Sequence, residues 1–131
     1  MAVASVLVVD DDIAALASAR AVLGAAGYAV KEALNGQRAL LQVIANPPRV
    51  LITEILMPEG DGIELIAAVK RSHPDVGIIA ATERGYLRGL DLLDLASKVG
   101  ADAILGKPLE AERLLAAVAR LAGSDARTGL N

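Results

Sequence analysis

Residues 50–62 read VLITEILMPEGDG, and this stretch decides the fold. It begins with three apolar residues, reaches a carboxylate at Glu54, and then turns through Pro58 and two glycines. Proline fixes its own φ and keeps the preceding residue out of the helical region, whereas glycine adopts backbone conformations that other residues avoid. We therefore predict a buried strand that delivers Glu54 to the edge of a sheet. The loop after it should shape a small acidic depression, which we call the mouth.

Apolar runs and amphipathic stretches alternate along the rest of the chain. Five short runs rich in Val, Ile, Leu and Ala predict strands at residues 6–9, 28–30, 50–52, 76–81 and 101–105. After each run, apolar residues at helical spacing predict a helix with a buried stripe. The five stripes are Ile13, Leu16 and Leu23; Leu40, Val43 and Ile44; Ile63, Ile66 and Val69; Leu92, Leu95, Ala96 and Val99; and Leu114, Leu115, Val118 and Leu121.

Five alternations of strand and helix with short connections indicate a parallel sheet with helices on both faces. Right-handed crossovers then favour the strand order 2-1-3-4-5, with two helices on one face and three on the other. The predicted fold class is α/β, a flavodoxin-like three-layer sandwich. We expect one domain over residues 1–122 and a flexible C-terminal tail over 123–131, where the sequence becomes small and polar.

Composition narrows the function classes. The net charge of −3 offers no broad basic surface for nucleic acid or an anionic membrane. The absence of cysteine excludes disulfides, thiolate catalysis and Cys-based metal sites. No apolar stretch approaches the ~20 residues that a membrane span needs. The apolar residues 2–9 are preceded by no basic residue and followed by three aspartates, which is not the pattern of a signal peptide. We expect a soluble, cytoplasmic protein.

Polar residues mark the carboxyl ends of four predicted strands: Asp10 and Asp11, Glu54, Thr82, and Lys107. Ligands of open α/β sheets bind beyond these ends, near the switch in strand order. Each residue alone has an ordinary structural role, such as helix capping or surface exposure. Together, three carboxylates, a hydroxyl and an ammonium could hold a hard divalent cation or contact a phosphoryl group.

From Val6 to about Leu121 the chain resembles the receiver domains of two-component response regulators, whose acceptor loop runs Asp-x-x-Met-Pro-x-x-Asp-Gly. Met57-Pro58 and Asp61-Gly62 match that pattern, but Glu54 stands at the phosphoacceptor position. The resemblance implies that Asp10, Asp11 and Glu54 are Mg²⁺ ligands. It also implies that Thr82 bonds a phosphoryl oxygen, and that Lys107, which precedes Pro108, reaches the phosphoryl group.

Three further departures bear on signalling. Ile104 stands where receivers carry a switch aromatic, and Glu83 stands where a small residue usually follows the Thr. The segment from Thr82 to Lys107 is a few residues longer than usual, which predicts an irregular start to the fourth helix. With Glu54, these features predict an atypical, stand-alone pseudo-receiver that is not an enzyme. We expect Glu54 to reach Lys107 and Thr82 as a phosphoaspartate mimic, and Mg²⁺ to bind only weakly because Lys107 competes.

Two other functions stay open from the sequence. A phosphorylatable receiver could use Glu54 itself or a neighbouring carboxylate, and a small-ligand-binding flavodoxin-like domain is the third hypothesis. As a receiver, the chain would bind a sensor kinase, a phosphotransfer protein or an output protein through its fourth helix, fifth strand and fifth helix. Helical geometry puts Tyr86, Leu90 and Leu93 on the outer side of the fourth helix, as an apolar partner surface. A homodimer is equally compatible with the sequence.

Overall fold

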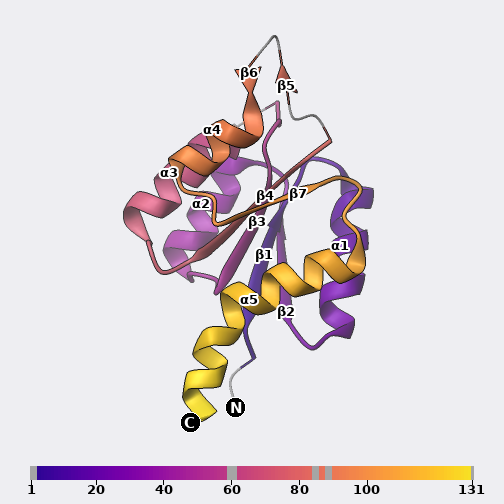
Figure 1. Ribbon diagram of the computed structural model, residues 1–131, viewed down its shortest axis with the longest axis vertical. Coiled ribbons are helices and arrows are strands. Elements are labelled where there is room, and N and C mark those ends of the chain that lie inside the picture. The colour runs from indigo at the N-terminus through magenta and orange to yellow at the C-terminus, as the bar shows by residue number, and fades with distance from the viewer. Residues whose placement is uncertain (1–2, 59–61, 84–85, 88–89, 131) are drawn as a thin grey trace.

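The core of the molecule is a five-stranded parallel sheet (Figure 1). The computed structural model describes residues 3–58, 62–83, 86, 87 and 90–130, and for 86, 87, 90 and 123–130 it describes the backbone alone. The strands lie in the order β2 (Ala29–Ala33), β1 (Ser5–Val9), β3 (Val50–Glu54), β4 (Gly77–Thr82) and β7 (Ala103–Gly106). Every neighbouring pair is parallel. The predicted order 2-1-3-4-5 is therefore confirmed.

Two helices cover one face of the sheet and three cover the other. α1 (Ile13–Ala25) and α5 (Ala111–Leu130) contribute to one buried apolar cluster. α2 (Gly36–Ala45), α3 (Gly62–Ser72) and α4 (Leu92–Val99) contribute to the second, on the opposite face. Because helices cover both faces, every residue of the central strands β3 and β4 is buried. This explains why these strands are nearly continuous apolar runs.

Capping residues set the helix starts that adjoin the mouth. The Asp12 carboxylate accepts hydrogen bonds from the backbone N–H groups of Ala14 and Ala15, so α1 begins directly after the three aspartates. Asp91 caps α4 in the same way through the N–H of Asp94. At its other end α4 stops at Gly100, whose φ of +132° suits glycine.

The fourth helix starts later than the apolar pattern predicted. Two short strands, β5 (Tyr86–Leu87) and β6 (Leu90–Asp91), pair antiparallel before this helix, and Figure 1 shows them at the top of the molecule. The predicted placement of Tyr86 and Leu90 on the outer side of the fourth helix is therefore wrong. Tyr86 lies in β5 and Leu90 lies in β6, and both precede the first residue of α4. Leu93 is half-buried against the core. The irregular start that we expected before the fourth helix is this antiparallel pair of strands.

Two residues of the predicted stripes are also exposed. Ile13 is 73% exposed at the first position of α1, and Ile44 is 59% exposed near the end of α2. Ile13 is the first residue of α1. Ile44 directly follows the buried Val43, so it lies off the face of α2 that Ala39 and Val43 turn to the core. The backbone of α5 continues as a helix to Leu130, and the flexibility expected for residues 123–131 stays a prediction. Among the described helices, none combines the length and the apolar character that a membrane crossing requires.

Candidate functional site

The mouth lies at the carboxyl edge of the sheet, where parallel register aligns the strand ends. Asp10 follows β1, Glu54 ends β3 and Thr82 ends β4, and each has 7% or less of its surface exposed. Lys107 follows β7, and its backbone N–H donates to the carbonyl of Thr82. Four residues from four different strands are thus brought to one place, as the sequence pattern indicated.

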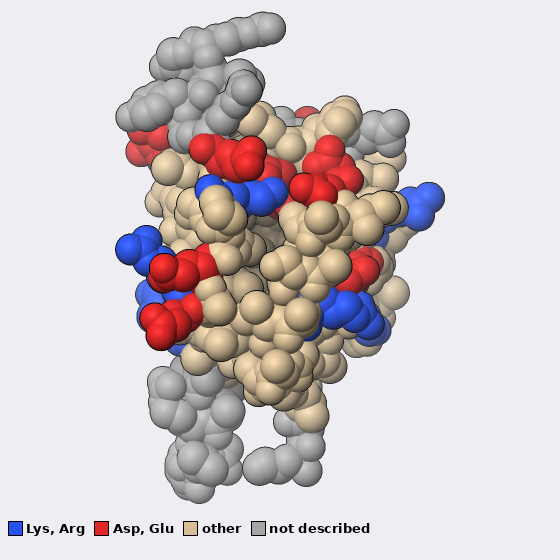
Figure 2. All heavy atoms as spheres, turned by 90° about the vertical axis from the view of Figure 1, so that its right-hand side faces the viewer, with Lys and Arg blue, Asp and Glu red and all other residues tan. Residues whose placement is uncertain are grey.

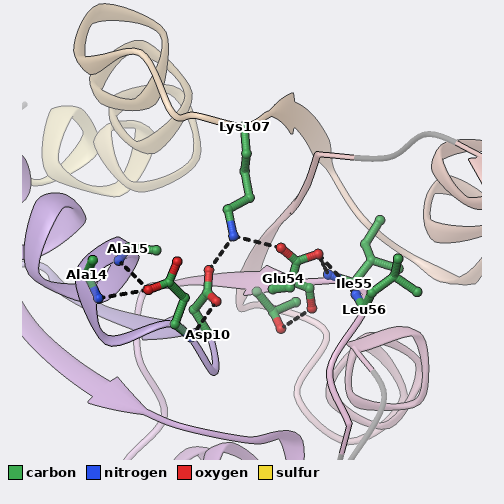
Figure 3. A network of polar contacts seen from close by, with 9 residues as sticks. Asp10, Ala14, Ala15, Glu54, Ile55, Leu56 and Lys107 are labelled. Carbon is green, nitrogen blue, oxygen red and sulfur yellow. Dashed lines mark hydrogen bonds and ion pairs between the residues drawn. The ribbon is translucent and has the colours of Figure 1, made fainter.

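Lys107 forms the centre of the mouth (Figure 3). Its Nζ lies 2.7 Å from Asp10 Oδ2 and 2.7 Å from Glu54 Oε1, so one ammonium bridges two buried carboxylates. Burial alone would lower the pKa of Lys107. The hydrogen bonds and negative charges of Asp10 and Glu54 outweigh that effect and raise its pKa above the ordinary 10.5. Lys107 is therefore held as a cation at neutral pH.

The remaining carboxylate oxygens are engaged by the backbone. Asp10 Oδ1 accepts from the N–H of Asp12 at 2.9 Å. Glu54 Oε2 accepts from the N–H groups of Ile55 at 2.8 Å and Leu56 at 3.0 Å, and Figure 3 shows the side chain turned back toward its own loop. The sequence predicted the contact between Glu54 and Lys107. It also predicted a contact with Thr82, whereas the second oxygen of Glu54 accepts from the two backbone amides. The sequence could not indicate these two hydrogen bonds, because every residue except proline supplies a backbone N–H.

A glycine lets the loop after β3 close around Glu54. The N–H of Gly62 donates to the carbonyl of Ile55, which brings the start of α3 against the end of β3. A Cβ at Gly62 would meet the backbone carbonyl oxygen of Glu54 and lie 2.8 Å from Ile55 Cα. Only glycine therefore permits this approach without movement of the backbone.

Exposed acids surround this buried centre. Asp11, Asp12 and Glu83 are exposed and line a depression of about 260 Å³ that also reaches Glu54 and Lys107. Within the described ranges, no three acidic or histidine side chains are arranged to hold a metal ion. The oxygens of Asp10 and Glu54 that would face an ion contact the Lys107 ammonium. As they stand, these residues fit an ammonium group better than a divalent cation.

Ile104, which stands where receivers carry a switch aromatic, lies in β7. It is half-buried and packs against the apolar cluster beneath α2, α3 and α4. A branched aliphatic side chain has no ring whose rotation could report on Thr82. The structure therefore places Ile104 as a packing residue.

Comparisons with known proteins agree with this arrangement. The response regulator receiver domain family matches residues 6–119. The response regulator MprA of Mycobacterium avium is 36% identical over 115 residues, which cover 85% of this chain and 47% of that protein. The chain thus spans about half the length of the curated relatives that it matches.

Solved structures give the same result. The chemotaxis protein CheY4 of Vibrio cholerae is 30% identical, with a TM-score of 0.82, over 92% of this chain and 99% of that one. A CheY-like receiver domain protein of Methanospirillum hungatei is 26% identical, with a TM-score of 0.87, over 97% and 99%. Receiver domains are signalling modules of two-component systems, and they typically bind Mg²⁺ at their phosphorylation site. Because the family model matches residues 6–119, which is most of its length, this chain belongs to the response regulator receiver domain family.

Proposed function

We propose that this chain is a pseudo-receiver: an interaction module of two-component signalling that adopts its signalling state without phosphorylation. The observation that carries the proposal is the 2.7 Å contact between Glu54 and Lys107. Glu54 occupies the acceptor position, and its longer side chain extends the charge toward the space that a phosphoryl group would fill. The carboxylate thereby makes a contact that the resemblance assigns to the phosphoryl group.

The surroundings of Glu54 disfavour phosphorylation. One oxygen is held by Lys107 and the other by two backbone amides, and the residue is only 7% exposed. An attacking oxygen must leave one of these partners and then align with the donor phosphorus. The extra methylene also displaces it from the position that an aspartate would take, and small displacements are costly in positioned reactions.

The mimicry of a phosphorylated aspartate is partial. A carboxylate carries one negative charge, whereas a phosphoryl group carries about −1.5 to −2 and three acceptor oxygens. Ile104 also removes the aromatic rotation that would couple Thr82 to the outer surface. We infer that the partner, a sensor kinase, phosphotransfer protein or output protein of the cytoplasm, binds α4, β7 and α5 in a state fixed by Glu54. Self-association through the same elements would give a homodimer.

Mg²⁺ binding at Asp10, Asp11 and Glu54 is proposed to be weak. A divalent cation would have to displace the ammonium from Asp10 and Glu54, and of the three proposed ligands Asp11 alone is exposed. Any bound ion would supply charge neutralisation, which Lys107 already provides.

A second candidate is a receiver that accepts a phosphoryl group on another carboxylate. Asp11 favours it, because this residue lines the mouth and is exposed. Asp10 is a poorer candidate, since both of its oxygens are engaged.

The test is incubation with acetyl phosphate and Mg²⁺, followed by intact mass measurement. The unaltered protein should gain no phosphoryl mass. Glu54→Asp shortens the side chain and should restore labelling, in which a carboxylate oxygen bonds to phosphorus and acetate leaves. Glu54→Gln should stay unlabelled, as the matched control that removes the charge.

Two outcomes would contradict the proposal. Labelling of the unaltered protein that Glu54→Gln abolishes would make it a working receiver. Labelling that survives Glu54→Gln and is lost in Asp11→Asn would favour the second candidate. For signalling, Glu54→Gln should weaken partner recovery in quantitative co-purification, whereas Glu64→Gln, an exposed acid on α3, should not.

A further inference from the structure

A cleft between α1 and the start of α5 opens into the mouth, and the two share Asp10, Asp12, Glu54, Glu83 and Lys107 in their linings. Its volume is about 270 Å³, and its rim includes Asp12, Glu83 and Lys107. Figure 2 looks onto this side of the molecule, where acidic side chains gather above a hollow with uncharged walls. A water molecule occupies ~30 Å³ in the liquid, so the volume of the cleft corresponds to about nine water molecules. It lies just below the range of about 300–1,000 Å³ that is typical of ligand pockets, so only a small molecule would fit.

Small side chains on α1 leave the cleft unfilled. Ala15, Ser18 and Ala19 form one wall, and Leu109 and Leu114 form part of the other. The chain has no Phe or Trp that could bridge such a gap. The walls thus offer aliphatic contacts to a slender apolar group.

The charged residues at the rim of the cleft determine whether it favours a cationic or an anionic ligand. Of the described residues at the rim, Lys107 alone is cationic, and its ammonium is already bound by Asp10 and Glu54 at 2.7 Å each. Asp12 and Glu83 are exposed at the same rim, and Asp12 uses one oxygen, Oδ1, to cap α1. Among the described residues, an anion would meet carboxylates and an ammonium that two carboxylates already share, whereas a cation would meet the carboxylates of Asp12 and Glu83.

We infer that the cleft binds a small aliphatic ammonium or guanidinium compound. The cationic head would lie between Asp12 and Glu83, and the aliphatic body would lie along Ala15 and Leu114. This binding does not depend on the role proposed for Glu54, and it would give a module that takes no phosphoryl group a chemical input of another kind.

The test uses n-hexylammonium as the probe, with hexanoate and hexanol as charge-reversed and neutral analogues. Dissociation constants are measured from amide chemical shift changes at Ala14, Ala15 and Ser18. Hexylammonium should bind saturably and more tightly than either analogue. In the series from butyl- to hexylammonium, each methylene should tighten binding about fourfold, the factor that corresponds to burial of one methylene group.

Variants separate the cleft from general surface charge. Ala15→Leu fills the cleft and should weaken hexylammonium binding at least tenfold. Ala17→Leu, at an exposed position of α1 outside the cleft, should leave it unchanged. Glu83→Gln should weaken binding of the ammonium severalfold and leave that of hexanol unchanged. Ser18→Leu replaces Ala15→Leu if circular dichroism shows that the latter does not fold.

Equal affinity for hexanoate would overturn the inference, and so would hexylammonium binding that survives both cleft-filling variants. Absence of saturable hexylammonium binding would overturn it as well. In that case a partner side chain would become the better occupant of the cleft.

Discussion

Removal of the Lys107 ammonium is the most informative perturbation of this protein. Lys107→Met keeps most of the aliphatic chain but leaves the carboxylates of Asp10 and Glu54 facing each other without a cation. Their side chains are only 9% and 8% exposed, and that of Lys107 is 13% exposed. Loss of one partner from a buried ion pair costs about 3–5 kcal/mol, because the remaining charge stays buried and unpaired. Since the mouth admits water on one side, we expect the lower end of that range.

The expected loss of unfolding free energy at pH 7 is therefore about 3 kcal/mol, with a fall in Tm of about 10 °C for a domain of this size. Urea unfolding followed by circular dichroism measures the first quantity, and a thermal scan measures the second. Lys98→Met is the matched control. Lys98 pairs with Asp94 on the surface of α4, its side chain is 72% exposed, and its loss should cost no more than about 0.5 kcal/mol.

A loss below about 1 kcal/mol in Lys107→Met would refute this reasoning, because the bridge would then contribute no more than an exposed ion pair. An equal loss in both variants would have the same meaning. In that case the mouth would be hydrated well enough for Asp10 and Glu54 to need no cation.

Three further predictions concern pH and local packing. Because the folded-state pKa of Lys107 is raised above 10.5, its stabilisation is complete below that pH and is lost as pH rises through the higher folded value; alkaline unfolding should show this loss in the unaltered protein and not in Lys107→Met. Gly62→Ala should cost at least about 2 kcal/mol in urea unfolding, since the backbone of Glu54 leaves no room for a Cβ, whereas Gly24→Ala, with open space around it, should be neutral or stabilising. Asp102→Ala should cost about 1–2 kcal/mol in the same assay, because the Ile78 N–H would lose its 2.8 Å carboxylate partner; no loss would mean that water replaces it.

The centre of the sheet was predictable because β1, β3 and β4 are buried on both faces. Such strands read as uninterrupted apolar runs, and the run at 50–52 lies in β3, every residue of which is buried. The meeting of Asp10, Glu54 and Lys107 followed from parallel register, which brings the carboxyl ends of strands to one edge. These features depend on periodicity and connection length, which a single sequence contains.

The missed features depend on information that periodicity lacks. Helical spacing put Leu90 on the outer side of the fourth helix, but Asp91 caps that helix and a short antiparallel pairing places Leu90 in β6. Ile13 and Ile44 were placed in the stripes as well, yet Ile13 is the first residue of α1 and Ile44 lies off the face of α2 that Ala39 and Val43 bury. The orientation of Glu54 Oε2 depends on the amides of Ile55 and Leu56, which every sequence supplies equally.

The bridge at Lys107 also bears on how the protein unfolds. It joins positions that lie 97 and 53 residues apart in the chain, so it can form only after β1, β3 and β7 have assembled. An interaction that is absent from the transition state leaves the folding rate unchanged and slows unfolding. The stabilisation by Lys107 should therefore appear almost entirely in the unfolding limb of a chevron plot. Lys107 would therefore lengthen the lifetime of the native state without changing how fast the protein folds.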